Sequence, residues 1–485
     1  MEKKGTDPSI GVGNLQTMKR DECAISACRT SEDKKDSKLL QAVSASESQT
    51  VLKDKKSEYD TQTPLKLPAE IEEALKQLQT YTPCYCYFED KLLENMRALL
   101  KYKAPFGLTV RYAMKANSTK AILQLMKMIG VAIDAATVNE CYRAIAAGIT
   151  PGMIQLTSQE VPSQEILMDL VLNKGIRYVA GSLRQLENYG VACRGKEVGI
   201  RFNIGIGSGG CKRTTTGGKE ASFGIYGQKP EIDRLLLAYG LTLTTVHLHI
   251  GSGSDPALQK EAAIKGLDIV AAYPTVTTLN LGGGFKVARM PNEKQTDIDE
   301  LSETTAQALL QFAKQTQRLI KLEIEPGTAS VALSGYVVGT VIDIVTTGED
   351  GYNFIKTDTG MTEVLRVALY GAQHPLYVVP MDSTTRCVKS YIVSGSCCES
   401  GDILTTAPHN PEELHPRTLI EAKVGDLLVI GAAGAYCSSM STANYNSHLK
   451  SAEYIVRHDG HIRLIRKRQT LEDLWQLELD LNSES

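Results

Sequence analysis

The feature that most constrains the fold is a regular alternation of strand-like and helix-like segments between residues 110 and 325. Eight short apolar segments fit buried strands, and several stretches between them carry apolar residues at helical spacing. Eight such units within about 220 residues predict a closed (β/α)8 barrel, with a doubly wound open sheet as the alternative. The predicted strands are residues 110–116, 131–136, 153–158, 177–182, 197–203, 243–251, 277–281 and 321–325.

The pattern changes after Gly327. Residues 331–346 form a long β-rich run, and further strand-like segments follow with little helical sequence between them. This predicts an all-β second domain, a sandwich or a barrel, that ends in a short helix at residues 471–477.

The chain therefore divides into four predicted parts. Residues 1–62 are rich in Ser, Lys, Asp, Glu, Thr and Gln and lack periodicity. This indicates a disordered tail, because such a segment buries too little apolar surface to offset its ordering entropy. The other parts are a lead-in strand that packs on the β domain (63–90), the barrel (91–330) and the C-terminal β domain (331–485).

Charge and cysteine content argue against several classes of protein. A formal net charge of −3 is unlike that of a nucleic-acid-binding protein, and no stretch approaches the ~20 apolar residues of a membrane span. The 11 cysteines are irregularly spaced and form no CxxC pair, so we expect neither a disulfide scaffold nor a metal site. The composition predicts free thiols and a cytoplasmic protein without nucleic-acid or membrane partners.

The ends of the predicted strands carry reactive residues, and a barrel of this kind has its active site there. Lys115, His249 and Glu325 lie at the ends of three strands, and Gly282–Gly284 follow a fourth. Each feature alone has a plainer interpretation. Lys115 could be a surface lysine, Glu325 a buried paired carboxylate, and the glycines a tight turn. His249 could be a core histidine with satisfied hydrogen bonds, or it could form a metal pair with His247, for which a third ligand is lacking.

One cofactor uses all four features together. Pyridoxal phosphate needs a lysine for its aldehyde, a flat partner for its ring, and a carboxylate that keeps its pyridine nitrogen protonated. Its phosphate needs a cradle, which three successive free N–H groups at Gly282–Gly284 would supply. The strand ends therefore predict pyridoxal phosphate.

Longer motifs carry a family resemblance. They include Cys398-Glu399-Ser400-Gly401-Asp402, Gly434-Ala435-Tyr436, His249-Ile250-Gly251-Ser252-Gly253 and the segment 321–327. Over residues 80–480 the sequence resembles the diaminopimelate decarboxylases, fold-type III pyridoxal-phosphate enzymes related to ornithine decarboxylase and alanine racemase. The resemblance implies decarboxylation of meso-2,6-diaminopimelate to L-lysine and CO2, the last step of lysine biosynthesis.

The resemblance also implies a set of cofactor-binding residues. Lys115 would form the Schiff base, His249 would stack on the ring, and Glu325 would pair with the pyridine nitrogen. The full implied set is Lys115, His249, Ser252, Gly283, Gly284, Glu325, Gly327 and Tyr436, of which Ser252, the two glycines and Tyr436 would hold the phosphate.

On the substrate side, the resemblance implies that Cys398 returns a proton after CO2 leaves and that Glu399 contacts the distal amino group. The catalytic set is then Lys115, His249 and Cys398, and the substrate-binding set is Arg366, Tyr370, Glu399 and Tyr436. In this family Cys398 and Glu399 would reach into the partner's site, so the resemblance implies a homodimer with shared active sites.

One departure from the family pattern concerns charge. Thr328 stands where the family usually has an arginine that helps to hold the phosphate or the substrate's carboxylate. Threonine offers a hydrogen bond but no charge. Two alternatives therefore stay open, which are decarboxylation of another diamino acid, such as lysine or ornithine, and a non-catalytic regulatory homologue.

Overall fold

The barrel predicted from the strand–helix alternation is present. The computed structural model describes residues 63–209, 215–253 and 255–481, so the predicted tail (1–62) lies outside the described residues. Within these residues, eight strands pair in chain order and close into a parallel barrel, which confirms the predicted fold class over the open sheet. They are β2 (Leu108–Ala113), β3 (Ala132–Ala135), β4 (Ile154–Leu156), β5 (Arg177–Ala180), β6 (Glu197–Arg201), β7 (Thr242–His247), β8 (Thr278–Asn280) and β9 (Lys321–Ile324).

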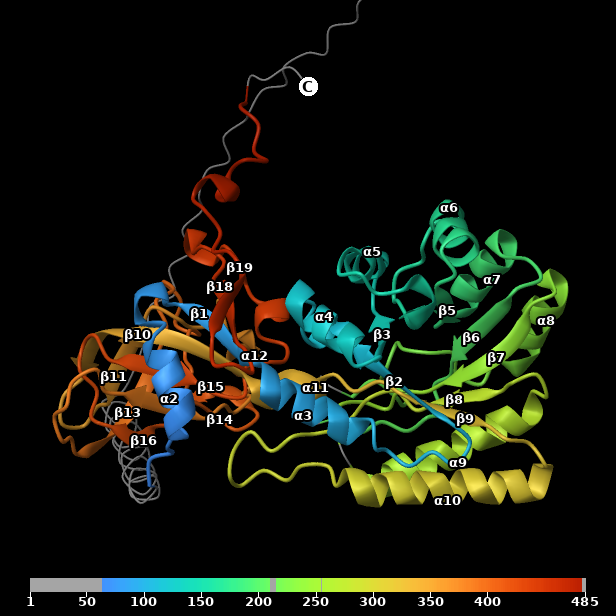
Figure 1. The fold of residues 1–485 in the computed structure, drawn as a ribbon, viewed down its shortest axis with the longest axis horizontal. Helices are drawn as coiled ribbons and strands as arrows, with labels where there is room; N and C mark the ends of the chain where they lie inside the picture. The colour runs from blue at the N-terminus through green and yellow to red at the C-terminus, as the bar shows by residue number, and fades with distance from the viewer. Residues whose placement is uncertain (1–62, 210–214, 254, 482–485) are drawn as a thin grey trace, which may run out of the picture. The chain divides into compact units, whose positions relative to one another are not determined.

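Helices alternate with the barrel strands and surround them (Figure 1). Local sequence sets several of their ends: the Thr137 and Ser182 hydroxyls cap two helices by accepting backbone N–H groups, and Gly240 ends another in the left-handed conformation. The helices of this region are α3 (Glu89–Leu99), α4 (Lys120–Met128), α5 (Val138–Ala146), α6 (Gln164–Leu167), α7 (Leu183–Ala192), α8 (Lys229–Tyr239), α9 (Pro256–Ala272), α10 (Ile298–Thr316) and α11 (Thr328–Val331).

The barrel interior holds an ion cluster beneath the strand ends, in which Arg111 and Glu323 are buried and Arg177 is partly exposed. Glu323 on β9 accepts from Arg111 Nε at 3.0 Å and from Arg177 Nη1 at 2.6 Å. Because side chains two residues apart on a strand point to the same side, Glu325 lies one layer above this cluster, toward the mouth. The cluster thus fills the lower interior and leaves the next layer for the site.

The β domain is built around a mixed sheet with the order β16-β13-β11-β10-β1-β18-β19, to which β12 and β17 also pair. Strand β1 comes from the start of the described chain and lies between β10 and β18, so blue and red ribbons run side by side in Figure 1. The strands are β1 (Cys84–Phe88), β10 (Gly335–Thr346), β11 (Asn353–Thr357), β12 (Leu376–Val379), β13 (Val388–Ser394), β16 (Arg417–Ile420), β17 (Leu427–Ile430), β18 (Ala452–Val456) and β19 (Ile462–Arg466), with a separate pair β14 (Thr406–Ala407) and β15 (Asn410–Leu414).

Two further helices belong to this part of the chain, α2 (Ala69–Lys76) and α12 (Leu365–Tyr370). The helix predicted at 471–477 is wrong, since only the single 3₁₀ turn Glu472–Leu474 forms there. Leu471 and Trp475 are exposed, and a segment this short is not a stable helix without an apolar face to bury. The domain bounds at 90 and 330 stay a prediction.

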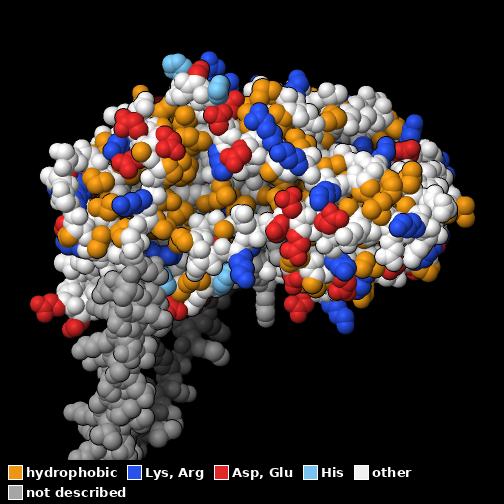
Figure 2. Space-filling view, turned by 60° about the horizontal axis from the view of Figure 1, so that its bottom comes forward, with side chains coloured by type: hydrophobic (Ala, Val, Ile, Leu, Met, Phe, Trp, Pro, Cys, Tyr) orange, Lys and Arg blue, Asp and Glu red, His pale blue; other side chains and the backbone are white. Residues whose placement is uncertain are grey.

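Acidic, basic and hydrophobic side chains are interspersed over the face drawn in Figure 2. Among the residues that the structure describes, no helix combines the length and the apolar character needed to cross a bilayer. These residues also contain no cluster of three or more His, Cys, Asp or Glu side chains suited to a metal ion.

Candidate active site

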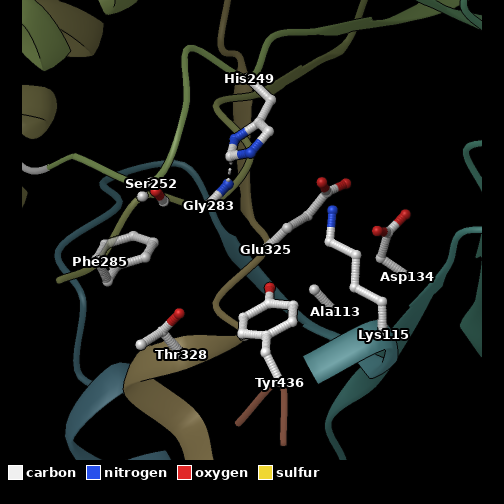
Figure 3. A pocket seen from close by; sticks show the side chains of 12 residues that line it. Ala113, Lys115, Asp134, His249, Ser252, Gly283, Phe285, Glu325, Thr328 and Tyr436 are labelled. Atoms are coloured by element: carbon white, nitrogen blue, oxygen red, sulfur yellow. Dashed lines mark hydrogen bonds between the residues drawn. The ribbon is translucent and has the colours of Figure 1, made fainter. Parts of the chain in front are cut away.

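A pocket lies at the carboxyl ends of the barrel strands (Figure 3). The pocket brings together every residue that the sequence implied for the cofactor. It is lined by Ala113, Lys115, Asp134, His249, Ser252, Gly283, Gly284, Phe285, Glu325, Gly327 and Thr328 from the barrel, and by Tyr436 from the β domain.

Lys115 lies on a 3₁₀ turn (Met114–Ala116) directly after β2, whereas the sequence predicted that the strand continues through it. The β domain fixes this turn, because the Ser439 hydroxyl donates to the carbonyls of Lys115 and Ala116 at 2.9 Å each. The N–H of Tyr436 also donates to the Ala116 carbonyl, at 2.8 Å. The Lys115 amine points toward the carboxylates of Glu325 and Asp134 (Figure 3).

Glu325 is buried and accepts three hydrogen bonds. Gln155 Nε2 and Asn280 Nδ2 donate to Oε1 at 2.8 and 2.7 Å, and His247 Nε2 lies 3.0 Å from Oε2. Burial alone would raise the pKa of this carboxyl, but His247 and the hydrogen bonds outweigh burial and lower the pKa to about 2. Glu325 therefore carries a fixed negative charge at neutral pH.

Asp134 is the second carboxyl at the floor of the pocket, and its environment is the opposite. Among the described residues its Oδ1 atom has no hydrogen-bond partner. Burial and then the nearby charge of Glu325 raise the pKa of Asp134 well above its usual value. Two neighbouring carboxyls with opposite shifts give the pocket one permanent anion and one group that takes up a proton more readily.

His249, Gly283 and Gly284 line the pocket together. The N–H of Gly283 donates to His249 Nδ1 at 3.2 Å, as the dashed line in Figure 3 shows. Burial, followed by the charges of Arg201 and Lys115, lowers the pKa of His249 well below its usual value. The imidazole is therefore neutral and presents a flat, uncharged ring beside the pocket.

The glycines are required by close backbone approach. A Cβ at Gly283 would lie 2.7 Å from the Glu325 carbonyl oxygen, and Gly284 has a φ of +109°. The expected row of three free N–H groups is wrong, because Gly282 N–H donates to Asn280 Oδ1 at 2.8 Å and Gly283 N–H donates to His249. Hydroxyl groups must then supply much of any anion site here, and Ser252, Thr328 and Tyr436 line it.

Two residues implied for the substrate lie just outside this pocket. Arg366 and Tyr370 are on α12, and the Arg366 guanidinium lies 5.9 Å from the Tyr370 ring centroid. The same guanidinium lies 6.0 Å from the ring centroid of Tyr436, which lines the pocket. Arg366 is thus a neighbour of the pocket through Tyr436.

Cys398 and Glu399 lie on an exposed loop of the β domain, and neither lines the Lys115 pocket. The loop is nevertheless ordered by specific contacts. Cys398 N–H donates to Asn446 Oδ1 at 2.7 Å, and the Tyr445 hydroxyl donates to Glu399 Oε2 at 3.1 Å. The Asp402 carboxylate holds the loop from within by accepting the N–H of Cys397 at 2.9 Å.

The residues that control Glu325 had no predicted role. Gln155, Asn280 and His247 come from three different strands, and His247 was weighed only as a metal ligand. Strand alternation was the available signal, since His247 sits two residues before His249. Which carboxyl it would meet depends on barrel closure, so the sequence alone could not pair them.

Known proteins are similar to this chain in both sequence and fold. The family model "Pyridoxal-dependent decarboxylase, pyridoxal binding domain" matches residues 90–332. Diaminopimelate decarboxylase of Escherichia coli K12 is 32% identical over 424 residues, which cover 86% of this chain and 96% of that protein. The enzyme of the same name from Streptomyces coelicolor is 34% identical over 387 residues, covering 76% and 84%.

Solved structures agree with the sequence matches. A crystal structure of diaminopimelate decarboxylase superposes with a TM-score of 0.78 at 32% identity, over 85% of this chain and 97% of the other. The Helicobacter pylori enzyme, crystallised with L-lysine, superposes with a TM-score of 0.71 at 28% identity, over 83% and 98%.

Proposed function

Because this chain belongs to the diaminopimelate decarboxylases, a family of pyridoxal-dependent decarboxylases, we propose that it converts meso-2,6-diaminopimelate to L-lysine and CO2. The observation that carries the proposal is the meeting of Lys115 with the ionised Glu325 in one pocket. A lysine beside a permanent anion, under a neutral histidine, is the arrangement that pyridoxal phosphate requires.

The residues of the pocket fit this cofactor. Lys115 offers the amine that bonds to its aldehyde, and the neutral ring of His249 offers a flat face for its ring. Ser252, Gly283, Gly284, Gly327 and Tyr436 surround the opposite side, where a phosphate would lie. When bound, pyridoxal phosphate supplies an electron sink for the electron pair left behind as a carboxyl group departs.

Glu325 sets the electronic character of the site. Its three donors hold the carboxylate in one orientation, and its low pKa keeps it ionised. A carboxylate accepts hydrogen bonds at about four lone-pair positions, so one remains for an N–H on the ring. The negative charge keeps that nitrogen protonated, which a neutral acceptor would not do.

Asp134 is the second carboxyl beside Lys115 in the pocket. Its raised pKa and its unpartnered Oδ1, among the residues described, make it a proton carrier next to the Lys115 amine. We propose that Asp134 exchanges a proton with the Lys115 amine as that amine is released from and returned to the cofactor.

The substrate-facing residues are completed by a second copy of the chain. We propose a homodimer in which Cys398 and Glu399 of one protomer face the Lys115 pocket of its partner. The supporting observation is that both residues are exposed on an ordered loop and absent from their own chain's pocket. Cys398 would then deliver the proton that replaces CO2, and Glu399 would bind the distal amino group.

We further propose that the protein works in the cytoplasm. The cysteines of the described residues are all free, including the exposed Cys387 and Cys398. Free exposed thiols persist in a reducing compartment. Fractionation of cells that express the full chain checks this, and recovery outside the cytoplasmic fraction would contradict it.

The experiment that tests the function is an assay of the purified protein with pyridoxal phosphate and meso-diaminopimelate, scored for CO2 and L-lysine together. L-Lysine and L-ornithine are offered in parallel. Equal amounts of lysine and CO2 from diaminopimelate support the proposal. Preferential turnover of lysine or ornithine, or a protein that binds no cofactor, would contradict it.

A further inference from the structure

Arg289 lies in the loop between β8 and α10, five residues after the last of the three glycines. The loop is closed on itself, because Lys286 and Thr296 bond to each other across it at 2.8 and 2.9 Å. A second turn is held by Glu293 Oε2, which accepts the backbone N–H of Arg289 at 3.0 Å. These contacts fix the backbone of Arg289 and do not involve its guanidinium group.

Two nitrogens of that partly buried guanidinium have no partner in the described part of the chain. Its Nε and Nη2 atoms have no hydrogen-bond acceptor among the described residues, and neither does Nε of Arg366. By contrast, Arg111 pairs with Glu323, and Arg386 pairs with Asp426. Among the described residues, neither Arg289 nor Arg366 has a carboxylate partner of this kind. Arg201 also has a buried nitrogen without a partner, but its guanidinium packs on the Phe223 ring. Buried N–H groups of a cation are costly to leave unpaired unless an anion joins them.

The positive charges of Arg289 and Arg366 affect the pKa values of the same neighbouring groups. Burial and then the charge of Arg366 lower the pKa of Arg289 to about 9, so it remains a cation at neutral pH. The same two charges depress the pKa of His374 after burial, and His374 Nδ1 lies 2.9 Å from the Gly431 carbonyl oxygen. Burial raises the pKa of Cys437 to about 11, so this neighbour is a neutral thiol and offers no counter-charge.

Tyr436 connects this pair to the active site. Its ring lies 6.0 Å from the Arg366 guanidinium. Tyr436 and Thr328 both line the Lys115 pocket (Figure 3). Arg366 therefore adjoins, through Tyr436, the pocket to which Thr328 brings no charge.

We propose that Arg289 and Arg366 jointly bind the carboxylate of the substrate that is not removed, with Arg289 supplying the guanidinium that Thr328 cannot. This inference rests on the proposed function. Two planar guanidinium groups can hold one carboxylate through several charge-assisted hydrogen bonds. Such a site would favour a substrate with a second carboxylate over ornithine or lysine.

The test compares Arg289→Met with the wild type and with Arg194→Met, which removes an exposed arginine bonded only to the Ala238 carbonyl. We expect KM for diaminopimelate to rise about 10- to 100-fold in Arg289→Met, with kcat changed less than about 3-fold. The dissociation constant of pyridoxal phosphate, from absorbance titration, should stay within about 2-fold. Adding Thr328→Arg to Arg289→Met should lower KM again, toward the wild-type value.

A second probe separates this inference from the proposed function. Pimelate is the seven-carbon diacid without amino groups, and its affinity for the cofactor-loaded protein is measured by calorimetry. We expect it to bind Arg289→Met about 10-fold more weakly than wild type, whether or not diaminopimelate is turned over. A wild type without turnover overturns the proposed function, whereas unchanged KM and unchanged pimelate affinity in Arg289→Met overturn the arginine site.

Two other outcomes are also decisive. Weaker cofactor binding with unchanged pimelate affinity would mean that the anion is the phosphate, which overturns the carboxylate site. If Arg289→Met fails to fold, Arg289→Lys replaces it, because it keeps the charge and loses the planar fork. KM and pimelate affinity equal to wild type in Arg289→Lys would overturn the inference, and a loss of about 5-fold or more supports it.

Discussion

Within a single chain, the Lys115 pocket is a formed cavity, whereas the Cys398 loop contributes no residue to that cavity. In the pocket, Glu325 has three donors from three strands and a pKa near 2, so its charge is set before any ligand arrives. On the loop, Cys398 and Glu399 are exposed, and their contacts order the backbone without facing a cavity of their own chain. The barrel thus prepares the cofactor half of the site, and the loop presents the other half outward.

The largest expected effect is at Lys115. Lys115→Ala should lower kcat by about 10⁴-fold or more and remove the absorbance of the bound cofactor, because no other amine takes its place in the pocket as described. Lys103→Ala is the matched control, since Lys103 is exposed and pairs only with Glu303. Full activity in Lys115→Ala would show that the pocket is not the catalytic site.

The next experiment tests the division between pocket and loop. Cys398→Ala should lower kcat by about 10²- to 10⁴-fold if this thiol returns the proton. Mixing inactive Lys115→Ala with inactive Cys398→Ala under subunit exchange should restore about a quarter of wild-type activity, because half of the dimers then contain one intact shared site. An unrestored mixture, in which exchange is verified by mass, would mean that each chain completes its own site.

A smaller effect is expected where charge rather than a covalent bond is removed. Glu325→Gln keeps the shape of the side chain and should lower kcat by about 10²- to 10³-fold. Glu187→Gln, which alters an exposed carboxyl, should leave kcat unchanged. Equal kcat values in the two variants would remove Glu325 from the mechanism.

The same residue gives a pH prediction with a definite sign. The pKa of Glu325 in the folded protein is about 2, below its ordinary value of 4.5. Its ionised form therefore stabilises the fold fully above pH 4.5, and this contribution is lost as the pH falls from 4.5 toward 2. The measurement is urea unfolding at about pH 5, above the ordinary pKa of the carboxyl, and at about pH 3, below it. The free energy of unfolding should fall less between these two pH values in Glu325→Gln than in wild type.

The smallest expected effect concerns the phosphate side of the pocket. Ser252→Ala removes one hydroxyl among several groups, so the dissociation constant of pyridoxal phosphate should rise only about 3- to 10-fold. Ser163→Ala removes the N-cap of α6, which does not line the pocket, and should leave cofactor affinity unchanged. A rise above about 100-fold would mean that Ser252 carries most of the phosphate binding.

Sequence periodicity was enough to predict the barrel, because each strand–helix unit has its own local pattern and closure follows from their number. The ends of those strands also predicted one site containing Lys115, His249, Gly283 and Glu325, and all four residues line the same pocket. The shape of the first strand's end was missed, since Lys115 sits on a 3₁₀ turn that the β domain holds in place. Local sequence contains no signal for a contact made with residues more than 300 positions away.

The sequence by itself determined which residue types are present and in what order, and with them the cofactor and the family. Tertiary structure decided their chemical states. Glu325 and Asp134 are both strand-end carboxyls, yet their pKa values shift in opposite directions. Barrel closure gives Glu325 the donors His247, Gln155 and Asn280 and leaves Asp134 buried without donors to Oδ1 among the described residues. Likewise, only the fold brings Arg289 beside Arg366, since the partners of a buried charge come from distant parts of the chain.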